Sequence, residues 1–316
     1  MNTVQVIQLS DNSIYLIGHN NEYLLVDTGP NYKGAWAHIQ SEIKTLQPNL
    51  VFITHGHHDH ASLGSGWQNS TVPVWIGTAD QRLVNEPVFS NPEEFSATMQ
   101  WLNDAGVPEP LIAIQGELLK KRKTQALRAA SGIQDSTPSG RWPSTLGFAP
   151  FEPDNTLSEK TELESVTLIP CPGHTIGNFV VAVPEEGWLF SGDQLLPEFD
   201  PTPSIQFIPN ETGQYVRFLS LPAYVKSLEQ LLPYNFTYCF PGLGSPFEDP
   251  NTRIKSALAR VERRVTRIEK AIIKGIEPNA YALAQHLYPH AIITSLRQLI
   301  ATTQGCLDIL KIKTNK

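Results

Sequence analysis

The feature that most constrains this chain is a cluster of histidines directly after a short apolar segment. Residues Leu50–Ile53 are continuously apolar, as expected of a strand that is buried on both faces. The next seven residues, 54–60, read THGHHDH and hold four of the nine histidines. A loop at the carboxyl end of a strand can turn several side chains into one small volume, and imidazole and carboxylate groups are good ligands for ions such as Zn²⁺. A polar surface loop is the alternative, but the position behind a core strand favours a metal site.

Strand and helix signals alternate along the chain. Runs rich in β-forming residues predict strands at 4–9, 13–18, 23–26, 73–77, 166–169, 179–183, 188–190 and 237–240. Helical spacing of apolar residues predicts helices at 36–46, 92–105, 109–130, 215–232 and 252–274. Residues 131–155 are dense in Pro, Gly and Ser and predict a long loop, whereas the C-terminus predicts helices at 278–287 and 291–304 and a strand at 307–312. The pattern indicates an α/β fold.

Charge is divided unevenly between the two parts of the chain. Residues 1–250 carry 12 Lys and Arg against 27 Asp and Glu, a net charge of -15, and residues 251–316 carry 12 against 4, or +8. The two sums give the net charge of -7 for the 316 residues. A hydrophobic content of 41% is enough to bury a core, which excludes a disordered chain.

Sequence features near the N-terminus and at the cysteines bear on location. Residues 1–18 lack a basic segment, a long apolar run and a small-residue cleavage site, so we read them as strands of a mature protein. No run is long enough to predict a membrane span. Cys171, Cys239 and Cys306 lie far apart, as is typical of free, buried thiols in a reducing compartment. These features predict a cytoplasmic protein.

Four ordered motifs resemble those of the metallo-β-lactamase superfamily. Residues 55–60, HGHHDH, are similar to its HxHxDH motif, and Asp27 in the segment VDTG resembles its first motif. Residues 171–175, CPGHT, resemble the third motif and supply His174, and residues 191–193, SGD, resemble the fourth and supply Asp193. The resemblance covers roughly residues 1–250 and implies a four-layer αββα sandwich with its site along one edge.

The resemblance also implies a set of ligands. The six positions, shared between two ions, are His55, His57 and His174 for the first, Asp59 and His60 for the second, and Asp193 bridging both. The fifth motif differs, because Leu243 stands where the family pattern has a histidine, and leucine cannot coordinate a metal. We therefore expect one tight ion and a second that is weak, absent or completed by water. Zinc is the expected metal, and iron or manganese would also suit these ligands.

Such a site implies a hydrolytic mechanism. A metal lowers the pKa of bound water from about 15.7 to about 7, and the resulting hydroxide would attack a carbonyl carbon or a phosphorus atom. Asp59 is expected to orient the nucleophile and carry its proton, with Asp193 on the metal beside it. Asp27 is expected to hydrogen-bond the loop of residues 54–60. The side chain of His58 is expected to lie among the residues around the ligands or in solvent.

The predicted insertion at residues 85–155 bears on the substrate. Its apolar side chains are Phe89, Phe95, Met99, Trp101, Leu102, Leu118, Leu119, Trp142 and Phe148. They are consistent with a lid over a pocket for a small apolar or acyl-bearing substrate. A satellite core or a homodimer contact explains them equally well. Relatives in the resembled family include hydroxyacylglutathione hydrolases, thioesterases and lactonases, so we expect hydrolysis of a thioester, a lactone or a similar carboxylic ester-type bond.

Two other functions stay open. A metal-dependent nuclease acting on RNA or DNA would use the eight Lys and Arg residues of the predicted helix 252–274. Against it, that helix lacks interleaved aromatic residues and the rest of the chain is acidic, so we expect charge complementarity between the two parts instead. A non-catalytic binding or regulatory protein would explain Leu243. The segment 251–316 is expected to be a winged-helix-like appendage, a helical brace or an oligomer contact.

Overall fold

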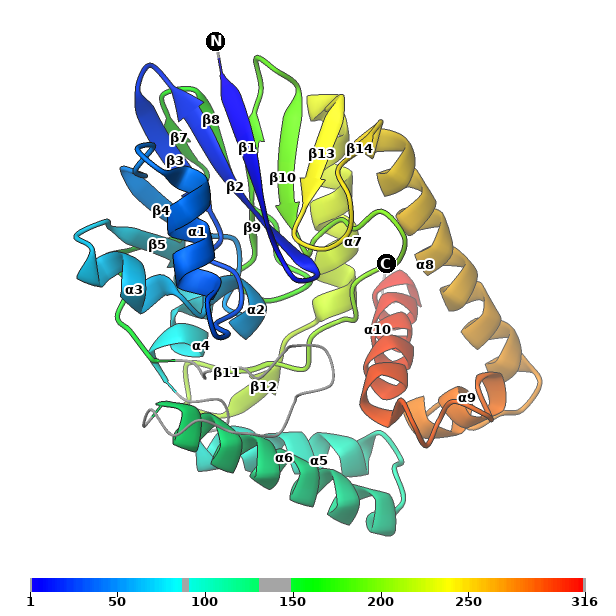
Figure 1. The fold of residues 1–316 in the computed structure, drawn as a ribbon. Helices are drawn as coiled ribbons and strands as arrows, with labels where there is room; N and C mark the ends of the chain where they lie inside the picture. Colours follow the sequence, from blue (N-terminus) through cyan, green and yellow to red (C-terminus); the bar gives the residue numbers. More distant parts are fainter. Residues whose placement is uncertain (1, 87–90, 131–148, 315–316) are drawn as a thin grey trace.

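The computed structural model describes residues 2–86, 91–130 and 149–314, with the backbone alone for residues 122–130. Two six-stranded sheets face each other, with helices on both outer sides (Figure 1). The first sheet has the order β1 (Thr3–Leu9), β2 (Asn12–His19), β3 (Glu22–Val26), β4 (Leu50–Ile53), β5 (Val74–Gly77) and β6 (Asn155–Leu157). The second has the order β14 (Phe247–Glu248), β13 (Tyr238–Pro241), β10 (Trp188–Gly192), β9 (Phe179–Val183), β8 (Val166–Pro170) and β7 (Thr161–Leu163).

The alternation of side chains along the strands builds the layers. In β2, Tyr15 and Ile17 point into the core between the sheets, and Ile14 and Leu16 point into the core on the other face of the first sheet. The outer core of the first sheet is completed by helices α1 (Ala35–Ile43) and α3 (Gly64–Asn69), and that of the second sheet by α7 (Ser220–Leu231) and α8 (Pro250–Ile273). The architecture is the four-layer αββα sandwich that the resemblance implied.

Parallel strands set the position of the loops that carry the histidine and aspartate motifs. Strands β3, β4, β5 and β6 pair in parallel, as do β10 and β13, so the loops after them leave the same edge of their sheet. Strand β4 is buried on both faces, with Phe52 between the sheets and Val51 and Ile53 on the helical side. The continuous apolar run therefore forms a strand that is buried on both faces, as the sequence predicted.

The insertion forms two helices whose bounds agree closely with the prediction, α5 (Pro92–Asp104) and α6 (Glu109–Ala130). They lie at the end of the sandwich that carries α2 (His58–Ala61), with the small sheet of β11 (Phe207–Pro209) and β12 (Tyr215–Arg217) between (Figure 1). Trp101 and Leu102 join the core of the C-terminal helices, and Tyr281 N–H donates to the carbonyl of Ala105. Part of the predicted lid surface is thus core; Phe89, Trp142 and Phe148 lie outside the described residues.

One predicted strand is wrong, and two predicted helices begin later than expected, among them the helix predicted at 291–304, which begins at Leu296. The strand predicted at 307–312 is helical and belongs to α10 (Leu296–Thr314), where Leu307 and its neighbours pack on the outer core of the second sheet. Short apolar runs are compatible with either structure, and packing against α8 and α7 decides the outcome here. The helix predicted at 215–232 begins only at Ser220, because residues 215–217 pair with β11 as a strand.

The C-terminal segment, residues 250–314, consists of helices α8, α9 (Ala280–Leu287) and α10 in the described part of the chain. It therefore lacks the terminal strand on which the winged-helix interpretation drew. Its basic side chains contact the preceding segment: the buried carboxylate of Asp200 accepts hydrogen bonds from Arg253, Arg260 and Arg264 at 2.7 to 3.4 Å. In the opposite direction, Nη2 of Arg217 donates to both carboxylate oxygens of Asp308 at 2.8 Å. The expected charge complementarity thus has a definite structural form.

Two smaller predictions concern the cysteines and the membrane. Cys171, Cys239 and Cys306 are free and buried, as the sequence predicted. Within the described residues, none of the helices has both the length and the apolar character needed to cross a bilayer.

Candidate metal centre

Ligand candidates reach one edge of the sandwich from several strands. His55, His57 and His60 follow β4, His174 follows β8, and Asp193 follows β10. The loop after β4 passes close to helix α4 (Gln81–Asn85), since a Cβ on Gly56 would lie 2.6 Å from the Cβ of Leu83. Residue 56 must therefore be small, which explains the glycine between the first two histidines.

Three imidazole nitrogens converge in this loop cluster. The Nδ1 atom of His57 lies 3.0 Å from Nε2 of His55 and 3.0 Å from Nε2 of His174. Three nitrogens on a tetrahedral zinc ion would be about 3.3 Å apart, given metal–nitrogen bonds of about 2.0 Å. All three atoms lie within 4.8 Å of one another, so the described residues bring together one group suited to a metal ion.

A second group adjoins the first. It joins His55 and His60 to Asp193, whose Oδ1 lies 3.3 Å from Nε2 of His60 and whose Oδ2 lies 3.6 Å from Nε2 of His174. The other ring nitrogen of His60 contacts a carboxylate, because Nδ1 lies 2.8 Å from Oδ2 of the buried Asp27. A proton on Nδ1 that is donated to a carboxylate leaves the Nε2 lone pair facing the site.

Asp27 also fixes the start of the motif loop. Its Oδ1 accepts from the Thr54 N–H at 2.7 Å, and its Oδ2 accepts from the Thr54 hydroxyl at 3.0 Å. The sequence predicted that Asp27 would hydrogen-bond this loop, and these contacts agree with that prediction.

Asp59 occupies a different position from the other five candidates. It lies outside both groups, with its Oδ2 3.8 Å from Nε2 of His60, and its side chain is 22% exposed. By contrast, His60 is 1% and Asp193 is 9% exposed. The geometry therefore brings five of the six predicted ligands together and leaves Asp59 at the more open side.

The pKa shifts of His55 and His174 favour cation binding by these two histidines. Burial, together with the neighbouring imidazole of His57, lowers the pKa of His174 to about 3, and burial with three histidine neighbours lowers that of His55 well below 6.5. Burial alone would lower the pKa of His60 too, but the carboxylates of Asp193, Asp27 and Asp59 outweigh it and raise that pKa. Neutral imidazoles present lone pairs, which a metal requires.

Two buried residues that support the site were not singled out from the sequence. Asp80 follows β5, and its carboxylate accepts from the N–H groups of Gly56 and Gly177 at 2.9 Å each and from the Thr175 hydroxyl. It thus links the second and third motifs. Its place just after a strand of the same sheet was the available signal.

The second unforeseen residue is Asn12, which lies between the two strands predicted at 4–9 and 13–18. It is fully buried, and its side-chain amide lies against Asp59 and His60. No spacing pattern marks this contact, because it joins positions 47 and 48 residues apart.

Leu243 lies next to the second group. It is 5% exposed, and its backbone forms an antiparallel bridge with Asn12. The preceding Gly242 is so close to the site that a Cβ there would lie 2.5 Å from Cε1 of His60 and 3.0 Å from Oδ1 of Asp193. Residue 243 is therefore near the second group, where leucine adds no donor atom.

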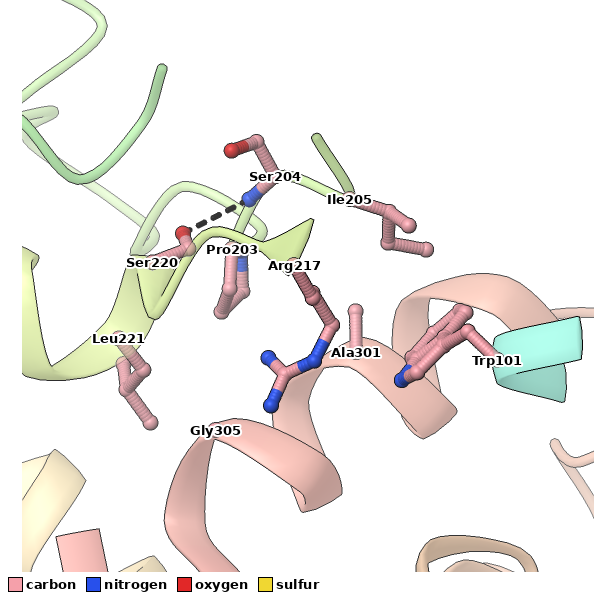
Figure 2. Close-up of a pocket in the computed structure, with 9 residues that line it drawn as sticks. All are labelled: Trp101, Pro203, Ser204, Ile205, Arg217, Ser220, Leu221, Ala301 and Gly305. Atoms are coloured by element: carbon pink, nitrogen blue, oxygen red, sulfur yellow. Dashed lines mark hydrogen bonds between the residues drawn. The ribbon is translucent and has the colours of Figure 1, made fainter. Parts of the chain in front are cut away.

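The residues present fit a divalent transition metal, since the first group offers three imidazole nitrogens at suitable separations. A small cavity elsewhere is too small for a substrate. It has about 10 Å³ and lies where α5, β12 and α10 meet, lined by Trp101, Arg217 and Gly305 among others (Figure 2). That volume holds about one water molecule.

The chain is similar to several known proteins. The family model of the "Metallo-beta-lactamase superfamily" matches residues 8–243. The "Probable metallo-hydrolase YqjP" of Bacillus subtilis is 24% identical over 315 residues, covering 96% of this chain and 88% of that protein. The "Beta-lactamase-like protein 2 homolog" of Drosophila melanogaster is 24% identical over 281 residues, which cover 87% of this chain and 73% of that protein.

A solved structure shares the fold over nearly the whole chain. The metallo-beta-lactamase family protein TTHA1429 from Thermus thermophilus superposes with a TM-score of 0.68 at 21% identity, covering 99% of this chain and 94% of that one. The family match spans most of the sandwich and includes every motif that supplies a candidate ligand. The chain therefore belongs to the metallo-beta-lactamase superfamily.

Proposed function

We propose that this protein is a metal-dependent hydrolase that cleaves a thioester, a lactone or a similar ester-type bond in a small apolar or acyl substrate. The observation that carries the proposal is the group of His55, His57 and His174, whose three ring nitrogens face one another with two separations of 3.0 Å. Zinc is the first choice for this group, and iron or manganese are alternatives.

The chain's own residues would divide the work between them. His55, His57 and His174 would hold the ion, and Asp193 would lie beside it. When bound, a divalent ion polarises a carbonyl group and makes water more acidic. Burial would raise the pKa of Asp59, but the charges of His60 and His57 and the hydrogen bond from Asn12 together outweigh it and lower that pKa. The carboxylate is therefore ionised at neutral pH and can accept a proton from the attacking water.

Exposed apolar side chains support an apolar substrate. Those on α6, β11, β12 and the adjoining segments are 39 to 54% exposed: Ile114, Leu118, Phe199, Ile208, Val216 and Leu219. Most of these elements lie at the end of the sandwich that carries α2 (Figure 1). Ligand sites are typically lined by apolar side chains with a few polar groups, which would suit an acyl substrate.

Nucleic acid receives less support as a substrate. Three arginines of the basic helix α8 are engaged by Asp200, and Glu262 of the same helix pairs with Lys313 at 3.1 Å. Charges that are satisfied within the chain are less available to phosphates. We therefore propose that α8 is a brace between the sandwich and the C-terminal helices.

Metal content is the direct test of the proposal. The wild-type protein, purified without added metal, should contain about one equivalent of zinc, iron or manganese by elemental analysis. His57→Ala should lose it, because His57 Nδ1 is the nitrogen that lies 3.0 Å from both partners. His38→Ala is the matched control, since His38 is exposed and contacts the carbonyl of Gln8. Full metal content in His57→Ala would contradict the assignment.

Substrate class needs a separate measurement. Thioester, lactone and RNA substrates should be compared with and without a chelator, using His57→Ala as the inactive control. We expect turnover of an ester-type bond that the chelator abolishes. Chelator-sensitive turnover of RNA alone would instead support the nuclease.

A further inference from the structure

The side chain of Asn12 lies where the second group of ligands meets Asp59. Its Nδ2 is 3.2 Å from the main-chain carbonyl oxygen of Asp59, 3.3 Å from Oδ2 of the same residue and 3.4 Å from Nε2 of His60. Asn12 is fully buried, and its own Oδ1 has no hydrogen-bond partner in the described structure. The amide nitrogen therefore lies against Asp59 and His60.

The contact with the main-chain carbonyl fixes which end of the amide faces Asp59. A carbonyl oxygen accepts hydrogen bonds and never donates them, so the NH₂ end must face it. A 180° rotation of the amide would put two oxygens 3.2 Å apart without a proton between them. The second N–H of Asn12 is then directed at Oδ2 of Asp59, with Nε2 of His60 beside it.

These two atoms are the ones that a second ion would need. An N–H group and a cation compete for the same lone pairs, so an amide held against Asp59 opposes coordination by that carboxylate. The position of Asp59 agrees with this, because it is the one predicted ligand that lies outside both groups. The antiparallel bridge between Asn12 and Leu243 places the residue without a donor atom directly beside the amide.

We infer that Asn12 is a positioning residue that holds Asp59 by hydrogen bonds, keeps it out of a second metal site and leaves its carboxylate free to act as a base. The inference rests on the proposed function, since it presupposes the ion at His55, His57 and His174. It adds that the chain is built for one tight ion and that two residues, Leu243 and Asn12, oppose a second.

Metal stoichiometry of Asn12 variants tests this inference without any activity measurement. Protein freed of metal with a chelator is titrated with Zn²⁺ and, separately, with Mn²⁺ by calorimetry. We expect one tight equivalent in the wild type. Asn12→Ala should bind a second equivalent at least about tenfold more tightly than the wild type does, a change of the size that residues supporting ligands produce.

A second variant guards against a folding defect in the first. Asn12→Asp keeps the shape of the side chain but replaces the N–H donors by an oxygen, so it too should gain a second equivalent. The matched control is Asn178→Ala, because Asn178 is also fully buried and donates to a main-chain carbonyl, that of Phe179 at 3.3 Å. It should leave the second equivalent unchanged.

The outcomes separate the two proposals. No tight ion in the wild type would refute the proposed function and the inference with it. One tight ion in the wild type, with the second affinity unchanged or weaker in both Asn12 variants, would overturn the inference alone. Two equally tight ions in the wild type would also overturn it, because Asn12 would then not oppose the second.

Discussion

Replacement of Asp200 by asparagine tests how the basic C-terminal helix is held against the acidic part of the chain. The Asp200 side chain is 5% exposed, and its two oxygens accept from Arg253 at 3.0 Å, from Arg260 at 2.7 and 2.8 Å, and from Arg264 at 3.4 Å. Asparagine is nearly isosteric but carries no charge and turns an NH₂ group toward the arginines. Asp200→Asn therefore removes the counterion and leaves three guanidinium groups facing one another.

The size of the effect follows from burial. Removing one partner of a buried ion pair costs about 3 to 5 kcal/mol. Arg260 and Arg264 are 29% and 33% exposed, so water can hydrate them in the variant, and the lower end of that range, about 3 kcal/mol, applies. Unfolding entropy of about 2.1 cal/mol/K per residue gives about 0.66 kcal/mol/K for 316 residues. The expected fall in Tm is therefore about 4 to 5 °C.

The pH dependence gives the effect a recognisable sign. Burial would raise the pKa of Asp200, but hydrogen bonds from Arg260 and Arg253 outweigh it and lower that pKa below 3.8. A carboxyl group whose pKa is lower in the folded state stabilises the fold at pH values above its unfolded pKa, and loses this effect as the pH falls through the folded value. The difference in Tm between wild type and variant should be full at pH 7 and shrink below about pH 4.

Scanning calorimetry at pH 7 and at several acidic pH values measures both quantities. Glu262→Gln is the control, because Glu262 and its partner Lys313 are 63% and 51% exposed, and exposed pairs contribute about 0 to 1 kcal/mol. Equal Tm values for Asp200→Asn and wild type at pH 7, or a difference that grows toward acid, would refute the reasoning.

Three further predictions concern the metal centre. Leu243→His should raise the content of a second metal equivalent, measured by elemental analysis, because residue 243 lies beside the second group; unchanged content would count against that placement. Gly173→Ala should weaken metal binding and lower the Tm, since Gly173 has φ 151° and a Cβ would lie 2.5 Å from the Cα of Tyr224, next to His174; wild-type affinity by calorimetry would contradict this. Because burial lowers the pKa of His174 to about 3, protons should displace the metal only well below pH 6.5 in dialysis at stepwise pH, and release near 6.5 would be inconsistent with the buried ring.

Much of the sandwich could be predicted from sequence because its strands carry a periodic apolar pattern. The continuous run Leu50–Ile53 identified β4 as buried on both faces, and the capped helix α5 begins at Pro92 after Asn91, whose side chain accepts from the N–H of Glu93. The failures have a different cause. Residues 215–217 form a strand because they pair with residues 207–209, and residues 307–312 are helical because neighbouring helices cover them. Neither partner is visible in the local pattern.

The candidate ligands could be identified from the sequence because metal chemistry restricts the residue type. A metal requires imidazole, thiolate or carboxylate groups, so His55 and His174 stand out in the sequence even though 119 positions separate them. Residues that support ligands face no such restriction. Asp80 acts by accepting main-chain N–H groups, a task open to several side chains, and only the fold brings it to Gly56 and Gly177.

The same distinction between ligands and the residues that support them bears on the number of ions that the site can hold. Leu243 is conspicuous in the sequence, because a residue without a donor atom replaces a histidine in a recognisable motif. Asn12 is not, because an asparagine between two predicted strands has an ordinary local explanation. Yet the two residues are bridged across the same corner, and Asn12 contacts the one carboxylate that stays outside both ligand groups. A count of motif ligands alone would therefore not decide whether a second ion binds weakly. The contacts of Asn12 favour a single ion, with Asp59 as a base.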